Sequence, residues 1–194
     1  MTNKTITAPK GFLAAGLFCG VKKSGKYDLG MIVCPGGANA AAVFTTNKIQ
    51  SAAVQIAKKH IKSKQIYAVV VNSGNANACT GTLGIKNAVK MCEETASHIE
   101  EDPHTVLVAS TGIIGEQLPI KTITDGIAKA AGQLSTSPES GMDFTSAIMT
   151  TDTKPKISVR QIDISGEKVT IAGTVKGAGM IAPNMATTLC FITT

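Results

Sequence analysis

Short apolar runs bounded by glycine, proline or asparagine alternate along this chain with two long amphipathic segments. Runs rich in β-branched residues are typical of strands, whereas apolar residues spaced three and four apart are typical of a helix that buries one face. Only 4% of the residues are aromatic, so the core must be built from Val, Ile, Leu, Ala and Met. A chain of 194 residues can bury about 70% of its unfolded surface. A mixed fold of the α/β or α+β class is therefore expected.

The order of the expected elements follows from these patterns. Residues 83–100 and 120–134 are expected helices, because apolar side chains recur in both at helical spacing. Residues 157–164 and 168–175 are expected to pair as a hairpin across Ser165-Gly166-Glu167. Asp143 is a candidate N-cap for a short helix over residues 143–149. The other expected strands are residues 28–34, 40–44, 53–56, 67–72, 106–110 and 189–192.

Composition limits the partners that the chain can bind. The formal net charge is +6, but the lysines are scattered apart from residues 58–64, and aromatic side chains that could stack on bases are scarce. This pattern is a poor match to nucleic-acid binding and suits small acidic substrates better. No apolar run approaches the ~18 residues of a membrane-spanning helix, so no membrane segment is expected.

The five cysteines are odd in number and show no CxxC spacing, which favours neither a metal site nor a disulfide framework. No secretory signal is recognised at the N-terminus. Together these features predict a protein of the reducing cytoplasm.

The last twenty residues suit one particular chemistry. A segment of small residues with a single lysine, Lys176, leads into Ala186-Thr187, and an apolar run follows. The Thr187 hydroxyl could attack the carbonyl before it, cut the chain and become an N-terminal threonine that carries its own amine base. The same residue types also form an ordinary turn before a buried strand, and both interpretations stay open on residue types alone.

Several segments of the chain together resemble one enzyme family. They are residues 176–187 (KGAGMIAPNMAT), 70–81 (VVNSGNANACTG), 106–115 (VLVASTGIIG), 147–155 (AIMTTDTKP), 8–12 (APKGF) and 43–48 (VFTTNK). Taken in their order along the chain, they are similar to the signatures of the ornithine acetyltransferase family, also called the glutamate N-acetyltransferase family. The likeness covers essentially the whole chain.

The resemblance implies a self-cleaving acyltransferase. Residues 1–186 correspond to the N-terminal (alpha) subunit and residues 187–194 to the start of the C-terminal (beta) subunit, with the cut between Ala186 and Thr187. Thr187 is then the nucleophile, and an acetyl-threonine ester carries acetyl from N-acetylornithine to glutamate in arginine biosynthesis. No metal or cofactor is implied, and acetyl-CoA is an open second donor.

The resemblance also assigns roles to four other residues. Thr111 and Gly112 form the oxyanion hole, where a glycine N–H and a hydroxyl can approach the developing negative charge. Lys176 and Thr153 contact the substrate, and an ammonium suits an α-carboxylate. Residue types alone would equally allow a strand-ending turn at Gly112, a solvated charge at Lys176 and a side-chain turn around Thr153.

The family's fold is an αββα sandwich, so two stacked sheets between helical layers are expected. Its members are longer than this chain, so the chain alone is not expected to be a complete catalyst. The implied partner is the C-terminal chain of the same precursor, in a heterotetramer of two alpha and two beta chains. Two alternatives remain: an N-terminal-nucleophile aminopeptidase of similar architecture, and a non-catalytic module.

Overall fold

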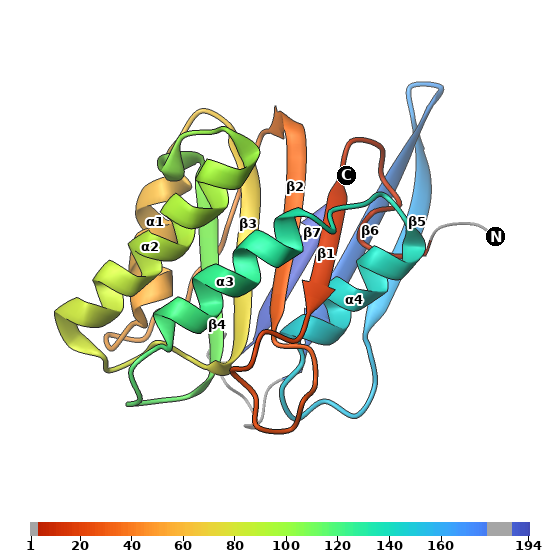
Figure 1. Cartoon of the computed structure of the whole chain (residues 1–194). Helices are drawn as coiled ribbons and strands as arrows, with labels where there is room; N and C mark the ends of the chain where they lie inside the picture. Colours follow the sequence, from red (N-terminus) through yellow and green to blue (C-terminus); the bar gives the residue numbers. More distant parts are fainter. Residues whose placement is uncertain (1–3, 178–187) are drawn as a thin grey trace.

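Two stacked sheets with helices packed against them make up the computed structural model, which describes residues 4–177 and 188–194 (Figure 1). The first sheet has the strand order β1-β2-β3-β4 and the second β5-β6-β7. Among the paired strands of this described part of the chain, only β3 and β4 run parallel. The strands are β1 (Leu13–Leu17), β2 (Leu29–Ala38), β3 (Ile66–Asn75), β4 (Val106–Ile113), β5 (Ile157–Ile164), β6 (Glu167–Lys176) and β7 (Leu189–Thr193). The helices are α1 (Ala52–His60), α2 (Gly81–Ile99), the short 3₁₀ turn η1 (Pro103–Thr105), α3 (Ile120–Ala131) and α4 (Pro138–Ile148).

Three helices cover one face of the four-stranded sheet. Alternate strand residues such as Val70 and Val106 point into this layer and are fully buried against Met91 of α2 and Ile127 of α3. Each fully buried side chain of this kind contributes roughly 1.5–3 kcal/mol. The larger of the two hydrophobic clusters therefore fixes α1, α2 and α3 on the sheet.

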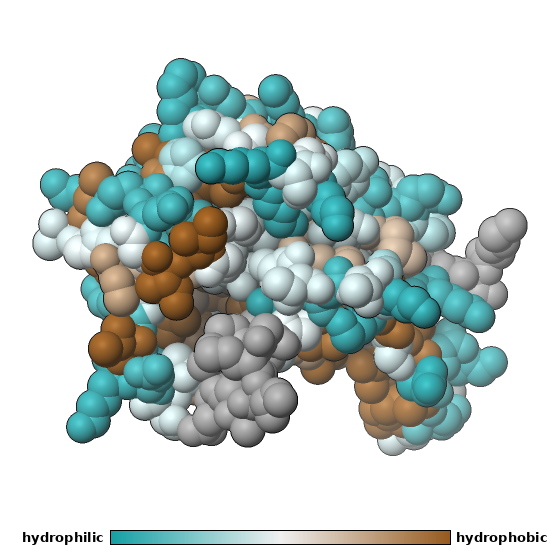
Figure 2. Space-filling model, turned by 90° about the horizontal axis from the view of Figure 1, so that it is seen from below, coloured by the Kyte–Doolittle hydropathy of each residue, from teal (hydrophilic) through white to brown (hydrophobic). Residues whose placement is uncertain are grey.

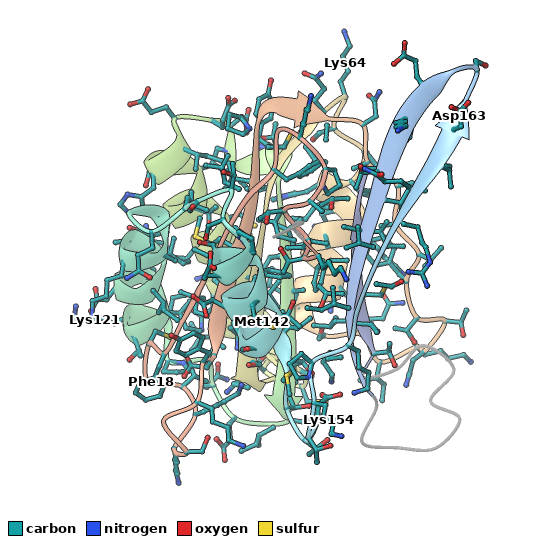
Figure 3. All side chains as sticks on the ribbon, turned by 90° about the vertical axis from the view of Figure 1, so that its right-hand side faces the viewer. Phe18, Lys64, Lys121, Met142, Lys154 and Asp163 are labelled. Atoms are coloured by element: carbon teal, nitrogen blue, oxygen red, sulfur yellow. The ribbon has the colours of Figure 1, made fainter. Side chains whose placement is uncertain are left out.

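The opposite face of this sheet packs against α4 and the second sheet. Ile32 and Val71 meet Phe144 of α4 there, and Phe144 contacts Phe191 of β7 edge to face with ring centroids 5.4 Å apart. Figure 3 shows α3, marked by Lys121, and the hairpin, marked by Asp163, on opposite sides of the molecule. The expected α+β fold with two stacked sheets is confirmed.

The outer face of the second sheet is exposed and apolar. Ile162, Ile164 and Ile192 are 42%, 52% and 67% exposed. Figure 2 shows hydrophobic residues gathered at the lower right, on the side where Figure 1 draws β5 and β6. Among the described residues no helix covers this face, so these residues supply three layers of an αββα sandwich.

Several expected elements are confirmed, two expected strands are wrong, and the expected N-cap of one helix is wrong. The helices at residues 83–100 and 120–134, the hairpin and the strands at residues 28–34, 67–72, 106–110 and 189–192 all appear, with shifted ends. Residues 53–56 belong to α1 instead of a strand, because the Ser51 side chain accepts a hydrogen bond from the Val54 N–H and starts a helix. Residues 40–44 form no strand and are largely exposed. The fourth helix starts at Pro138, capped by Ser137 instead of Asp143.

Candidate active site

The parallel pair β3 and β4 brings two of the signature segments to one edge of the sheet. Ser73 lies opposite Thr111, and Gly74 lies opposite Gly112. In open sheets, ligands bind outside the carboxyl ends of parallel strands. The turn that follows β4 is therefore placed where a substrate can reach it.

Lys176 joins this edge from the second sheet. It is the last residue of β6, is only 2% exposed, and its Nζ donates to Thr111 Oγ1 over 2.9 Å. These residues are 65 positions apart in the sequence. The structure thus brings together the residue expected to bind substrate and one of the two expected in the oxyanion hole.

The charge of Lys176 is shaped by its surroundings. Burial lowers the pKa of the Lys176 ammonium, and the negative charge of Asp152 raises it in part. A buried ammonium is stable only where it is paired or hydrogen-bonded. An anionic group arriving at this point would supply a further partner.

Gly112 sits in backbone contact with Gly74. Its φ of +134° is one that residues with side chains rarely adopt, and a Cβ placed on it would lie 2.3 Å from the Gly74 carbonyl carbon. Gly112 is nevertheless exposed on its other side. No other residue type can hold the turn this close to β3.

One asparagine side chain links the end of β3 to the segment after β4, and a second links the loop after β3 to α2. Asn75 Nδ2 donates to the carbonyls of Glu116 and Gln117 over 3.2 and 3.3 Å, while Asn75 Oδ1 accepts from the Asn77 N–H over 2.8 Å. Asn77 Nδ2 in turn donates to the Gly84 carbonyl. Asn75 therefore holds the segment after β4 against the end of β3.

A buried carboxylate organises the loop before β2. Asp28 is fully buried, and its oxygens accept from the backbone N–H groups of Cys19, Gly20, Val21 and Lys22 over 2.7–3.2 Å. A carboxylate that accepts several backbone N–H bonds makes strong, charge-assisted contacts. The Asp28 carboxylate therefore holds the start of the loop at residues 18–27 in place.

Lys22 extends this loop across the candidate site. Its Nζ donates to the carbonyls of Tyr27 and Met149, the second over 2.7 Å. A Cβ on Gly74 would lie 3.0 Å from Lys22 Cγ, so the lysine stem passes directly over the residue paired with Gly112. Burial lowers the pKa of Lys22 to about 8, although the Asp28 charge opposes this shift.

Asp28→Asn should destabilise the folded protein by about 2–4 kcal/mol, because the amide NH₂ would face backbone N–H donors and leave them without an acceptor. The measurement is urea unfolding of the full-length protein. Asp125→Asn is the control, since Asp125 forms an exposed ion pair with Lys121 and such pairs contribute little. Equal midpoints for the two variants would contradict the role given to Asp28.

Thr153 lies in the segment between α4 and β5 and is exposed. Within the described residues no hydrogen bond joins it to Thr111 or Lys176. Its neighbour Asp152 does reach the site, because Asp152 Oδ1 accepts from the Gly177 N–H over 2.6 Å. The sequence patterns allowed a side-chain turn around Thr153, and nothing in the spacing of Asp152 indicates this distant contact.

Ala186 and Thr187 lie outside the described residues, so their expected roles in cleavage and nucleophilic attack stay predictions. The nearest described segments before and after these two residues both lie at the site. Leu189 pairs with Lys176 in the sheet, and Gly177 follows Lys176 directly.

Over residues 4–177 and 188–194, no cluster of three or more His, Cys, Asp or Glu side chains could hold a metal ion. In the same part of the chain, every helix is too short or too polar to cross a lipid bilayer.

Comparison with known proteins shows which family the chain is similar to. The ArgJ family matches residues 13–194. The "Arginine biosynthesis bifunctional protein ArgJ, mitochondrial" of Lodderomyces elongisporus is 49% identical over 98% of this chain, and the ArgJ protein of Caldanaerobacter subterraneus is 47% identical over 97%. This chain spans 45% and 46% of the length of these relatives, so it corresponds to about half of each.

Two solved structures share the fold. The crystal structure of the arginine biosynthesis bifunctional protein from Bacillus halodurans matches with a TM-score of 0.90 and 42% identity, covering 96% of each chain. The ornithine acetyltransferase of Mycobacterium tuberculosis, solved in complex with ornithine, matches with a TM-score of 0.88 and 35% identity, covering 94% of this chain and 96% of that one. By sequence and by structure, the chain belongs to the ArgJ family.

Proposed function

We propose that this chain is the N-terminal part of an ornithine acetyltransferase of arginine biosynthesis. The complete enzyme moves acetyl from N-acetylornithine to glutamate through an ester on Thr187, after the precursor cuts itself between Ala186 and Thr187. The names of the relatives support the pathway, and the ornithine complex of the Mycobacterium tuberculosis protein supports the substrate.

The contact between Lys176 Nζ and Thr111 Oγ1 is the observation that carries this proposal. A hydroxyl that accepts a hydrogen bond from an ammonium can still donate its own proton. Thr111 is therefore free to direct its O–H, together with the Gly112 N–H, towards the oxygen of a tetrahedral intermediate. Donors already aimed at that oxygen are worth about 3–4 kcal/mol each in comparable enzymes.

Lys176 serves the substrate in this scheme. Its buried ammonium binds the α-carboxylate of the amino acid, and this places the acetyl group or the acceptor amine near Thr187. After cleavage the threonine α-amine, with a reference pKa of about 8, takes the hydroxyl proton. Acetyl transfer to Thr187 releases ornithine, and attack by the glutamate amine restores the free hydroxyl.

The rest of the precursor is the proposed partner. Relatives extend to about twice this length, and the apolar outer face around Ile162, Ile164 and Ile192 offers it a surface to cover. A heterotetramer of two N-terminal and two C-terminal chains completes the proposal. A cytoplasmic location stays a prediction.

The decisive experiment uses the full-length protein. Intact mass spectrometry should show two chains with a new N-terminal threonine, and N-acetylornithine with glutamate should yield N-acetylglutamate. Peptide hydrolysis that needs no amino-acid acceptor would favour the aminopeptidase alternative. A single uncleaved chain would favour the non-catalytic module. The same assay with acetyl-CoA decides whether the enzyme also uses that donor.

Thr111→Val should lower kcat for acetyl transfer by about 10²–10³-fold, since one oxyanion donor is lost while the shape of the side chain is kept. Thr111→Ser is the matched control, because it restores a hydroxyl at the same position. Steady-state kinetics on the processed enzyme measure both. If the Thr111→Val enzyme is as fast as the Thr111→Ser enzyme, Thr111 does not act in the oxyanion hole.

A further inference from the structure

One carboxylate ties together the two segments that carry the expected substrate residues. The Asp152 side chain is only 2% exposed. It accepts hydrogen bonds from the Gly177 N–H, from Lys156 Nζ and, over 3.4 Å, from the Thr150 N–H. A carboxylate this deeply buried is retained only where such partners offset the loss of hydration.

The position of these partners links Asp152 to the site. Gly177 directly follows Lys176 at the end of β6, and Asp152 directly precedes Thr153. The hydrogen bond from Gly177 to Asp152 spans 25 residues and joins the end of a strand to the segment before β5. Asp152 therefore fixes the backbone on which the Lys176 side chain is mounted.

The charge of Asp152 also acts on Lys176. Burial alone would raise the pKa of Asp152, but hydrogen bonds from Lys156, Gly177 and Thr150 outweigh it and hold this pKa below its usual range. The carboxyl is thus ionised at neutral pH, and its charge raises the pKa of Lys176 against the effect of burial.

We propose that Asp152 is a positioning residue that fixes the end of β6 and supplies the counter-charge for the substrate-binding ammonium of Lys176. This inference rests on the proposed function of Lys176. Asp152 itself does not touch the substrate and acts through the lysine. Its effect on the reaction is therefore a change in substrate binding that depends on pH.

Three lysines lie in the described segments that meet at the site. Lys154 and Lys156 share the segment with Asp152, and Lys22 reaches Met149 from the loop before β2. From β4 the neighbour is the Thr111 hydroxyl, and from β7 it is the apolar Leu189. Among these described groups Asp152 is the negative one, so its removal leaves burial to act on the pKa of Lys176.

The test is Asp152→Asn in the full-length enzyme. The amide oxygen can still accept from Gly177, so the turn is kept while the charge is lost. Without that charge the pKa of Lys176 falls further, and the ammonium is lost at a lower pH. We expect KM for the amino-acid substrate to rise about tenfold at pH 9 with little change at pH 6, and kcat at pH 6 to be kept.

Two controls separate this role from a structural one. Asp125→Asn removes an exposed carboxylate on α3, and Lys156→Met removes an ion-pair partner but keeps the Asp152 charge. Neither should move the pH profile of KM to lower pH. An Asp152→Asn enzyme whose KM rises equally at both pH values, or at neither, overturns the proposal.

A second readout does not depend on turnover. The titration of Lys176, followed by NMR in protein carrying ¹³C at the lysine ε carbon, should shift to lower pH in Asp152→Asn. An unchanged titration overturns the inference. If the wild type forms no N-acetylglutamate, the proposed function fails, while this titration still decides whether Asp152 controls the charge of Lys176.

Discussion

Thr187→Ala in the full-length precursor should leave one uncleaved chain and lower acetyl transfer by about 10⁴-fold or more. The substitution removes the hydroxyl that attacks the Ala186 carbonyl and that later carries acetyl. Without cleavage, residue 187 also keeps its nitrogen in an amide, which cannot act as a base. Intact mass and N-acetylglutamate formation measure the two losses separately.

The adjacent threonine provides a matched control. Thr188→Ala removes a hydroxyl one residue further on and should leave cleavage intact, because the family motif ends at Thr187. Two chains from the Thr187→Ala precursor would refute the assignment. So would an acetyl label, trapped from the donor, on any residue other than Thr187.

Gly112→Ala should destabilise the folded protein by about 4 kcal/mol or more, among the largest effects of a single methyl group. The added Cβ would lie 2.3 Å from the Gly74 carbonyl carbon and 2.5 Å from the Asn75 nitrogen. These are backbone atoms of a paired strand, so they cannot rotate away. The φ of +134° adds strain of its own.

Gly115→Ala is the control for this prediction. Gly115 lies three residues further on, in the bend after β4, with a φ of +87°, but a Cβ there meets nothing within 4 Å. The Gly115→Ala variant should lose only roughly 1–2 kcal/mol of unfolding free energy, which is the cost of a positive φ for a residue with a side chain. Urea unfolding of both variants measures the difference, and equal losses would show that β4 can move away from β3.

The crowding at Gly112 also bears on how its chemistry can be probed. A variant that unfolds the turn slows turnover whether or not the glycine N–H binds an oxyanion. The hydroxyl of Thr111 can be removed without such a clash, since Val and Thr have the same shape. Thr111→Val is therefore the cleaner probe of the oxyanion hole.

Long periodic segments and specific motifs made much of this structure predictable from sequence. The helices α2 and α3 have enough turns for helical spacing to stand out, and the hairpin of β5 and β6 is a local structure. The motifs placed Thr111, Gly112 and Lys176 in one site, and the contact between Thr111 and Lys176 agrees with this. The short run at residues 53–56 was misleading, because three apolar residues among four suit a strand and a helix turn equally.

The polar residues that support the site could not be predicted in the same way. Asp28 gathers four N–H groups of one loop, Asn75 links two loops, and Asp152 bonds a glycine 25 residues away. Their partners are backbone groups, which are present along the whole chain. A sequence pattern of side chains therefore cannot predict these contacts. They become visible only once the sheets are assembled.

Pairing between β6 and β7 has a consequence for any break in the chain between Lys176 and Leu189. Ala172 to Lys176 are registered against Leu189 to Thr193, residue for residue. After cleavage, the strands on both sides of the break would therefore remain hydrogen-bonded in one sheet. Cleavage would create a new N-terminus but keep it close to the site. The two resulting chains would stay associated through the pairing of β6 with β7.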